Sequence, residues 1–226
     1  MLIEIPEIFS PDEAADIRSR LEAAHWHDGA ATAGHIAARA KTNEQLSDSD
    51  PLGAELANLV VERLSRYPRF IASALPLKMM PPRFNRYTGD GAYGPHIDNA
   101  VFSASGSTDR VRSDLSATLF LSEPDTYDGG ELVTQFGTMT KAIKLPAGHL
   151  ILYPSSSVHQ VMPVTRGARY ASFFWVQSMV RQQSHRTMLL ELDESIQALT
   201  ARSPDNPEIV RLTGLYHNLL REWVDT

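Results

Sequence analysis

The segment from Tyr93 to Asp98 carries residue types that can bind a metal ion. Side chains two positions apart on a β-strand point to the same face, so His96 and Asp98 can reach one ion together. Two histidines and one carboxylate on one face of an octahedron are the ligand set expected for non-heme Fe(II), with the other positions open to O2. The segment provides two of these three ligands, and a second histidine must come from elsewhere in the chain.

The sequence around this pair is more specific than the pair itself, because a chain with eight histidines and fourteen aspartates contains a His-x-Asp by chance about half the time. An expected strand with Asn85-Arg86-Tyr87 and a glycine-rich loop precede it. Three segments follow it: Tyr127 to Leu132, Pro154 to Val161, and Pro163 to Arg169. Their order and spacing resemble the prolyl 4-hydroxylase-like family of iron- and 2-oxoglutarate-dependent dioxygenases, most closely its bacterial PKHD-type hydroxylases. The resemblance covers most of the chain.

His159 is the candidate third ligand. Taken alone, it fits better a histidine at the edge of the core that is capped by a hydroxyl from Ser155 to Ser157. Its spacing after His96 and Asp98 matches the resemblance, and on that basis we favour the role of ligand. Such a site has one negative charge and two neutral imidazoles, and it leaves three positions for 2-oxoglutarate and O2.

Two further residues are candidates for binding the cosubstrate. Arg169 stands ten residues after His159, where the family carries its basic anchor, and a guanidinium binds a buried carboxylate through two hydrogen bonds. Collagen-type prolyl hydroxylases carry lysine at this point, so the arginine agrees with the PKHD-type branch instead. Tyr87 is a candidate hydrogen-bond donor to the cosubstrate. The alternatives are an exposed strand arginine for Arg169 and a packed barrel tyrosine for Tyr87.

The resemblance implies an Fe(II)- and 2-oxoglutarate-dependent dioxygenase that hydroxylates a primary substrate and releases succinate and CO2, with L-ascorbate as reductant. The primary substrate is open between a prolyl or lysyl residue of a peptide and a small molecule of iron uptake. The alternative function is a jelly roll that binds a metal without turnover, as a sensor or ligand binder, which would not need Arg169. A halogenase on the same scaffold would need a small residue in place of Asp98.

Composition limits the other classes of function. The 226 residues include no cysteine, which excludes disulfides and thiolate ligands. The net charge of −6 argues against a nucleic-acid partner. The N-terminus lacks a basic region and a long apolar core, and no run of about eighteen apolar residues occurs. We therefore expect a cytoplasmic protein with no membrane contact.

The hydrophobic pattern predicts a double-stranded β-helix, or jelly roll, braced by N-terminal helices and followed by a C-terminal helical hairpin. Helices should start at Ser10-Pro11 and Asp50-Pro51, and the second should end before Pro68. We expect a dioxygenase domain over 1–180, with a helical part (1–76) and a jelly-roll core (77–180), and a helical subdomain over 181–226. The eight expected core strands are 83–88, 93–98, 115–122, 130–136, 141–145, 150–153, 158–164 and 169–178.

The sequence also supports predictions for three connecting segments. Residues 26–49 should form a loop or weak hairpin near the entrance of the site, and 103–113 a mobile loop beside the metal. A three-residue loop over 165–167 should pair Pro163 with Arg169 and place Gly167 at positive φ. That loop would turn Arg169 toward the same face as His159.

The C-terminal hairpin carries two apolar stripes, which exceed what one narrow contact between its helices requires. We expect these side chains to bury against the barrel or against a second subunit, and we favour a homo-oligomer. The residues concerned are Leu215, Tyr216, Leu219 and Trp223.

Overall fold

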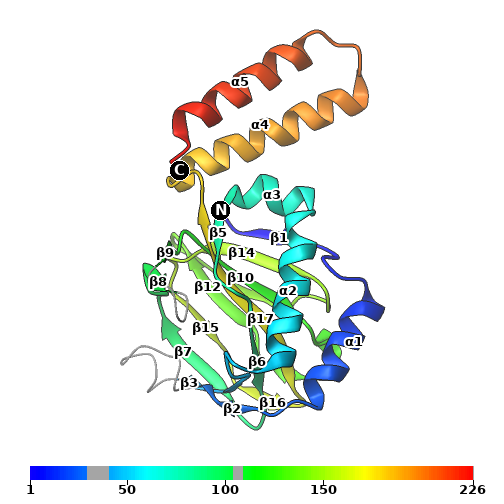
Figure 1. Ribbon diagram of the computed structural model, residues 1–226, viewed down its shortest axis with the longest axis vertical. Coiled ribbons are helices and arrows are strands. Elements are labelled where there is room, and N and C mark those ends of the chain that lie inside the picture. Colours follow the sequence, from blue (N-terminus) through cyan, green and yellow to red (C-terminus); the bar gives the residue numbers. More distant parts are fainter. Residues whose placement is uncertain (30–40, 104–108, 226) are drawn as a thin grey trace.

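The computed structural model describes residues 1–29, 41–103 and 109–225 and shows two antiparallel β-sheets with helices beside them (Figure 1). The larger sheet has the strand order β1-β14-β10-β17-β6-β4-β2, and β5 also pairs with β17. The smaller sheet has the order β13-β12-β15-β7-β3. The predicted jelly roll is confirmed.

Each of the eight expected core segments overlaps a strand, although several bounds differ by two or more residues. The larger sheet consists of β1 (Ile3–Ile5), β14 (Leu150–Pro154), β10 (Leu115–Phe120), β17 (Arg169–Ser178), β6 (Arg83–Tyr87), β4 (Glu44–Gln45), β2 (His27–Asp28) and β5 (Pro76–Met79). The smaller sheet consists of β13 (Met139–Ile143), β12 (Leu132–Phe136), β15 (His159–Val161), β7 (Ala92–His96) and β3 (Lys41–Thr42). Two short pairs accompany them: β11 (Asp128–Gly129) with β16 (Val164–Arg166), and β8 (Val101–Ser103) with β9 (Arg110–Arg112).

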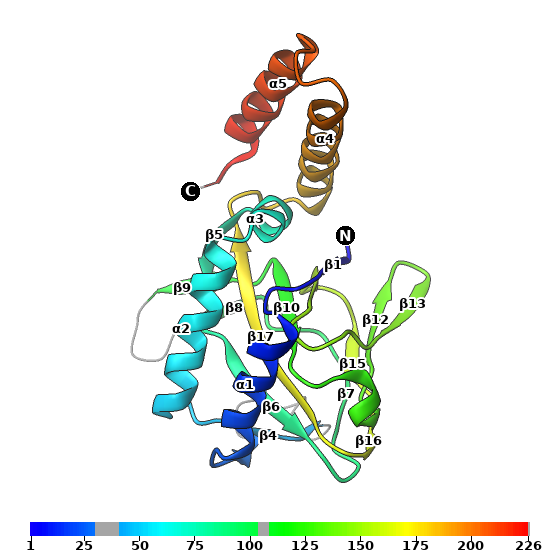
Figure 2. The same cartoon turned by 90° about the vertical axis from the view of Figure 1, so that its right-hand side faces the viewer.

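Helices α1 (Pro11–Glu22) and α2 (Pro51–Ser65) pack on the larger sheet, on the side of the molecule away from the β12–β13 hairpin (Figure 2). The predicted capping box is present: the Ser10 hydroxyl accepts from the Glu13 amide, and the Glu13 carboxylate accepts from the Ser10 amide. The apolar stripes of both helices join one core with alternate residues of the sheet. Its members include Ile17, Leu21, Leu56, Val60, Leu64, Leu119, Phe174 and Val176.

A short helix that was not predicted follows α2. Helix α3 (Pro68–Ala74) begins at the proline that was predicted to end the preceding helix. Proline suits the first position of a helix as well as the position after one, because its missing amide is not needed there. Helix α3 packs against α4 and so connects the barrel to the C-terminal hairpin.

The connection from β15 to β17 differs from the predicted hairpin. Strand β16 pairs with β11, with Asp128 opposite Arg166, and β17 pairs with β6 and β10 in the other sheet. The predicted pairing of Pro163 with Arg169 is therefore wrong. Gly167 does have positive φ, at 73°, as predicted, and a Cβ there would collide with the carbonyl oxygen of Thr126.

Strands occur both in the stretch that was expected to be a mobile loop, 103–113, and in the stretch that was expected to be a loop or weak hairpin, 26–49. Strands β8 and β9 form a ribbon in which Phe102 pairs with Val111, so a mobile loop over the whole of 103–113 is wrong; its tip, 104–108, lies outside the described residues. Within 26–49, β2 pairs with β4 and β3 pairs with β7, in which Lys41 lies opposite Tyr93. Residues 30–40 also lie outside the described part of the chain.

The C-terminal hairpin consists of α4 (Gln183–Arg202) and α5 (Glu208–Trp223), and Figure 1 shows it standing away from the sheets. Its base is held by an isolated β-bridge between Val180 and Val224. Tyr216, Leu219 and Trp223 pack there around buried Leu75, Val180 and Leu189. Leu215, in contrast, is 49% exposed.

Candidate active site

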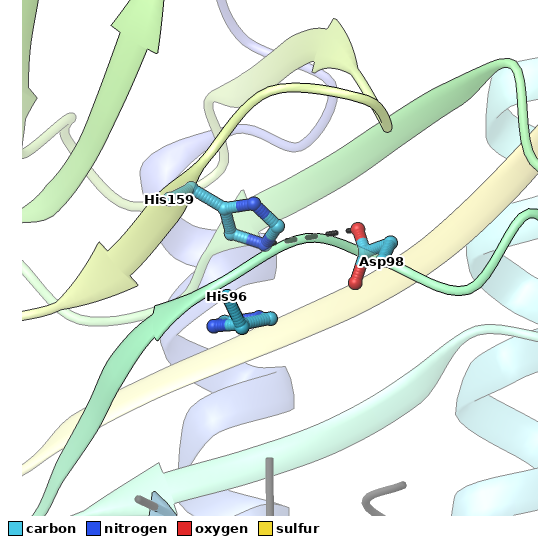
Figure 3. A group of neighbouring side chains, drawn as sticks. All are labelled: His96, Asp98 and His159. Atoms are coloured by element: carbon cyan, nitrogen blue, oxygen red, sulfur yellow. Dashed lines mark ion pairs between the residues drawn. The ribbon is translucent and has the colours of Figure 1, made fainter. Parts of the chain in front are cut away.

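The structure brings the three predicted metal ligands together at one wall of the barrel (Figure 3). His96, Asp98 and His159 each offer a ligand atom, and these atoms lie within 4.8 Å of one another. His159 lies opposite His96 on the adjacent strands β15 and β7, and its Nε2 is 3.7 Å from Asp98 Oδ2. A cluster of two imidazoles and one carboxylate is the donor set that suits Fe(II) with open coordination positions.

Asp98 reaches the cluster in a different way from the one expected. Strand β7 ends at His96, so the aspartate lies beyond the strand and the two-residue period does not place it. A hydroxyl positions it instead: Ser116 on β10 donates a hydrogen bond of 2.5 Å to Asp98 Oδ2 and shares one of 2.8 Å with Ser155. The sequence analysis missed the role of Ser116, although a polar residue in a buried strand was a usable signal.

Both imidazoles are oriented by the backbone. The Nδ1 of His96 lies 2.8 Å from the carbonyl oxygen of Gly94, and the Nδ1 of His159 lies 3.0 Å from that of Ser157. Because a carbonyl oxygen only accepts, each Nδ1 must carry the proton, and each Nε2 keeps a lone pair for a metal.

The protonation of His96 also suits metal binding. Burial, with His159 close by, lowers the pKa of His96 to about 4, so the ring is neutral near pH 7. Tyr93 stacks on this ring with the centroids 3.6 Å apart. The residues present therefore fit a resident Fe(II) ion.

Arg169 lies in the same cavity and is 1% exposed. Among the described residues, its Nε and Nη2 have no hydrogen-bond partner. The guanidinium lies between the rings of Tyr87 and Phe120, with its Cζ 5.4 and 5.2 Å from the two ring centroids. A buried cation without a hydrogen-bonded counter-ion is costly, so this site favours an anion that has two acceptor oxygens.

Tyr87 lies in the larger sheet opposite Arg169 and is also buried. Burial raises the pKa of its phenol, and the charge of Arg169 works against that shift. The phenol therefore keeps its proton and can donate a hydrogen bond into the cavity.

One cavity of about 630 Å³ connects the metal cluster with Arg169 and Tyr87. His159 and Arg169 enter it from different sheets, because the chain crosses from the smaller sheet to the larger between them. Its volume lies within the usual range of small-molecule sites and exceeds the need of a ten-atom dicarboxylate. Sequence reasoning did not foresee several other lining residues, among them Lys41, Arg83, Phe102, Phe173 and Trp175.

Comparisons with known proteins first define the class. Residues 82–177 match the family model of the 2OG-Fe(II) oxygenase superfamily. A 2OG-Fe(II) oxygenase-family oxidoreductase from Burkholderia pseudomallei is similar with a TM-score of 0.53 at 18% identity, covering 78% of this chain and 84% of that one. A Pseudomonas putida prolyl-4-hydroxylase has a TM-score of 0.52 at 16% identity, covering 78% and 92%. These structures share the fold, and the chain is an Fe(II)- and 2-oxoglutarate-dependent dioxygenase.

The particular family follows from nearer relatives. Residues 184–225 match the family model of the PKHD-type hydroxylase C-terminal domain. A PKHD-type hydroxylase of Nitrobacter winogradskyi is 59% identical over 226 residues, and both chains are fully covered. The PKHD-type hydroxylase PiuC of Pseudomonas aeruginosa is 56% identical over 223 residues, 99% of each chain. The chain belongs to the PKHD-type hydroxylases.

No helix among the described residues is both long enough and apolar enough to span a membrane.

Proposed function

We propose that this enzyme binds Fe(II) through His96, Asp98 and His159 and hydroxylates a primary substrate in the cavity beside them. The observation that supports this proposal most is the combination of three convergent ligand atoms with a buried guanidinium whose Nε and Nη2 have no hydrogen-bond partner among the described residues, all in one cavity. A metal store or sensor would need the first feature and would have no use for the second.

The reaction follows from the family chemistry. With Fe(II) bound, O2 is activated while 2-oxoglutarate loses CO2, so that one oxygen atom enters succinate and the other replaces a substrate hydrogen as hydroxyl. L-Ascorbate is our proposed reductant for keeping the metal in the ferrous state.

The protein side chains perform binding and orientation. The Nδ1 bonds of both histidines and the Ser116 bond to Asp98 keep the three ligands aimed at one point before metal arrives. Arg169 binds the C5 carboxylate of 2-oxoglutarate, and Tyr87 donates a hydrogen bond beside it. The rings of Tyr87 and Phe120 on either side of the guanidinium exclude water and strengthen that ion pair.

Three wider proposals accompany this function. The division into a dioxygenase domain over 1–180 and a helical subdomain over 181–226 is supported by the separate position of the hairpin in Figure 1. A homo-oligomer is supported by the exposed apolar residues of that hairpin. A cytoplasmic location remains a prediction from the sequence.

Anaerobic titration with Fe(II) tests the metal site. His96→Ala, Asp98→Ala and His159→Ala should each lose most of the Fe(II) affinity of the wild type while the far-ultraviolet circular dichroism stays the same, since apolar strands hold the barrel together. His25→Ala, at an exposed histidine of no proposed role, is the matched control and should titrate like the wild type. Wild-type affinity in His159→Ala would overturn the proposed ligand set.

A further inference from the structure

The cavity has a second wall, which is aromatic and has no role in holding iron or 2-oxoglutarate. Phe102, Phe173 and Trp175 line this part of the cavity. The rings of Phe102 and Trp175 are stacked with their centroids 3.9 Å apart, and Phe173 meets Trp175 edge-on at 5.7 Å. We call these three residues the aromatic wall.

The aromatic wall lies close to the metal cluster because of the register of the larger sheet. Arg169, Phe173 and Trp175 share one face of β17 and line the cavity, with Arg169 at one end and Trp175 at the other. Trp175 pairs with Ser116, whose hydroxyl holds Asp98. A ring bound at the wall would therefore lie next to the metal ligands, on the far side from the guanidinium that binds the cosubstrate.

Two cations face the same space. Arg83 pairs across the sheet with Phe173, and Lys41 enters from the smaller sheet with its Nζ 5.4 Å from the centroid of Tyr93. Burial and the charge of Arg83 lower the pKa of Lys41 to about 8, so the amine is still mostly charged near pH 7. Asp48 pairs with Arg83 from the outside, at 2.6 Å and with 43% of its own side chain exposed.

The lining of the cavity includes two cations besides Arg169. Fe(II) and dianionic 2-oxoglutarate carry equal and opposite charges, and Asp98 and Arg169 are likewise opposite. Lys41 and Arg83 are the other charged side chains among the described lining residues, and Arg83 is also ion-paired with Asp48. This positive lining belongs to a chain of net charge −6, so it is a local feature and not an effect of overall composition.

We propose that the primary substrate is a small anionic molecule with a flat aromatic ring. The ring packs against the aromatic wall, and the acidic group lies toward Arg83 and Lys41. This inference rests on the proposed function, because it fills the space that Fe(II) and 2-oxoglutarate leave. A lysyl side chain would bring a positive charge toward two others, and a saturated ring would lose the stacking geometry that flat rings prefer.

Calorimetric binding to the protein loaded anaerobically with Fe(II) and 2-oxoglutarate tests this with three matched probes. Phenylacetate has the ring and the charge, cyclohexylacetate lacks the flat ring, and phenethylamine reverses the charge. Phenylacetate should bind about tenfold more tightly than either of the others. Equal binding of cyclohexylacetate overturns the role of the ring, equal binding of phenethylamine overturns the role of the charge, and no binding of phenylacetate overturns both.

Variants locate the site. Phe102→Ala and Arg83→Gln should each weaken phenylacetate about tenfold. Val101→Ala, at a 48% exposed neighbour that alternates to the other face of β8, is the control and should have no effect. Trp175→Phe keeps the wall filled and should weaken binding less than Phe102→Ala does. Unchanged phenylacetate affinity in Phe102→Ala and Arg83→Gln would place the probe elsewhere and overturn the proposal.

Two further measurements separate this inference from the function on which it rests. Fe(II) and 2-oxoglutarate should bind to Phe102→Ala and Arg83→Gln as they do to the wild type. If the wild type binds neither, the proposed function fails, whatever the probes do. A short prolyl or lysyl peptide that binds more tightly than phenylacetate would show a peptide substrate and overturn the small-molecule proposal.

Discussion

The barrel cavity and the C-terminal hairpin are incomplete in opposite ways. The cavity buries polar atoms that have no hydrogen-bond partner among the described residues, including Arg169 Nε and Nη2. The hairpin exposes apolar side chains instead: Val210 is 76% exposed and Leu215 is 49% exposed. One region is suited to binding an anion, and the other to contact with an apolar surface.

This difference determines what each region can recognise. A buried guanidinium held between two rings accepts only a partner with acceptor oxygens in a suitable position, so the cavity is selective. An apolar stripe on a helix gains free energy from any apolar surface that removes it from water. The described residues of α5 include none that is buried, so a second copy of the chain would gain most there.

The largest effect should come from removing the cation of the cavity. Arg169→Ala should abolish measurable binding of 2-oxoglutarate, because the C5 carboxylate would lose its counter-ion. Arg169→Lys keeps the charge but loses the two-pronged geometry, so the apparent KM should rise about ten- to a hundredfold, equivalent to about 1.4 to 2.7 kcal/mol.

Succinate release at low 2-oxoglutarate concentration measures this effect. Arg166→Lys is the matched control, since Arg166 is an exposed arginine three residues earlier that pairs with Asp128 at 2.7 Å. Unchanged succinate release in both Arg169 variants would mean that another residue anchors the cosubstrate.

A smaller effect is expected from the hydroxyl that orients Asp98. Ser116→Ala should weaken Fe(II) binding about tenfold, because the carboxylate would lose its 2.5 Å hydrogen bond while remaining in place. Ser195→Ala, on the exposed surface of α4, serves as the control in the same anaerobic titration. An Fe(II) affinity in Ser116→Ala equal to that of the wild type would show that the hydroxyl has no orienting role.

The smallest effect on the site should come from the hairpin. Val210→Glu combined with Leu215→Glu should lower the oligomer order without changing Fe(II) affinity, because charge at these exposed apolar positions opposes apolar contact. Deletion from Gln183 onward should lower the oligomer order or the solubility in the same way. Light scattering measures the mass. A strictly monomeric wild type would remove the proposed oligomer and leave the cavity account intact.

The sequence alone predicted the parts of this molecule that local patterns determine. Strand β17 was predicted from Arg169 to Ser178, and the capping box at Ser10 was predicted because its partner is three residues away. Gly167 has the positive φ that was expected, although the three-residue hairpin from which it was expected does not form. The three candidate ligands were chosen through the family resemblance, and the structure brings their ligand atoms within 4.8 Å of one another.

Local sequence patterns did not predict which strands pair with each other. The two-residue period tells which residues of a strand share a face, but it does not tell which strand pairs with it. For that reason the predicted pairing of Pro163 with Arg169 missed β11, whose partner β16 lies more than thirty residues later. Lys41 was missed in the same way, because β3 has only two residues and enters the cavity wall by pairing with β7.

The most direct measurement of the central claim is anomalous diffraction at the iron edge from crystals grown anaerobically with Fe(II) and 2-oxoglutarate. The account predicts a single iron peak bonded to His96 Nε2, His159 Nε2 and a carboxylate oxygen of Asp98, with a cosubstrate carboxylate paired to Arg169. Iron at any other residues, or a cosubstrate that leaves Arg169 without an anion, would contradict it.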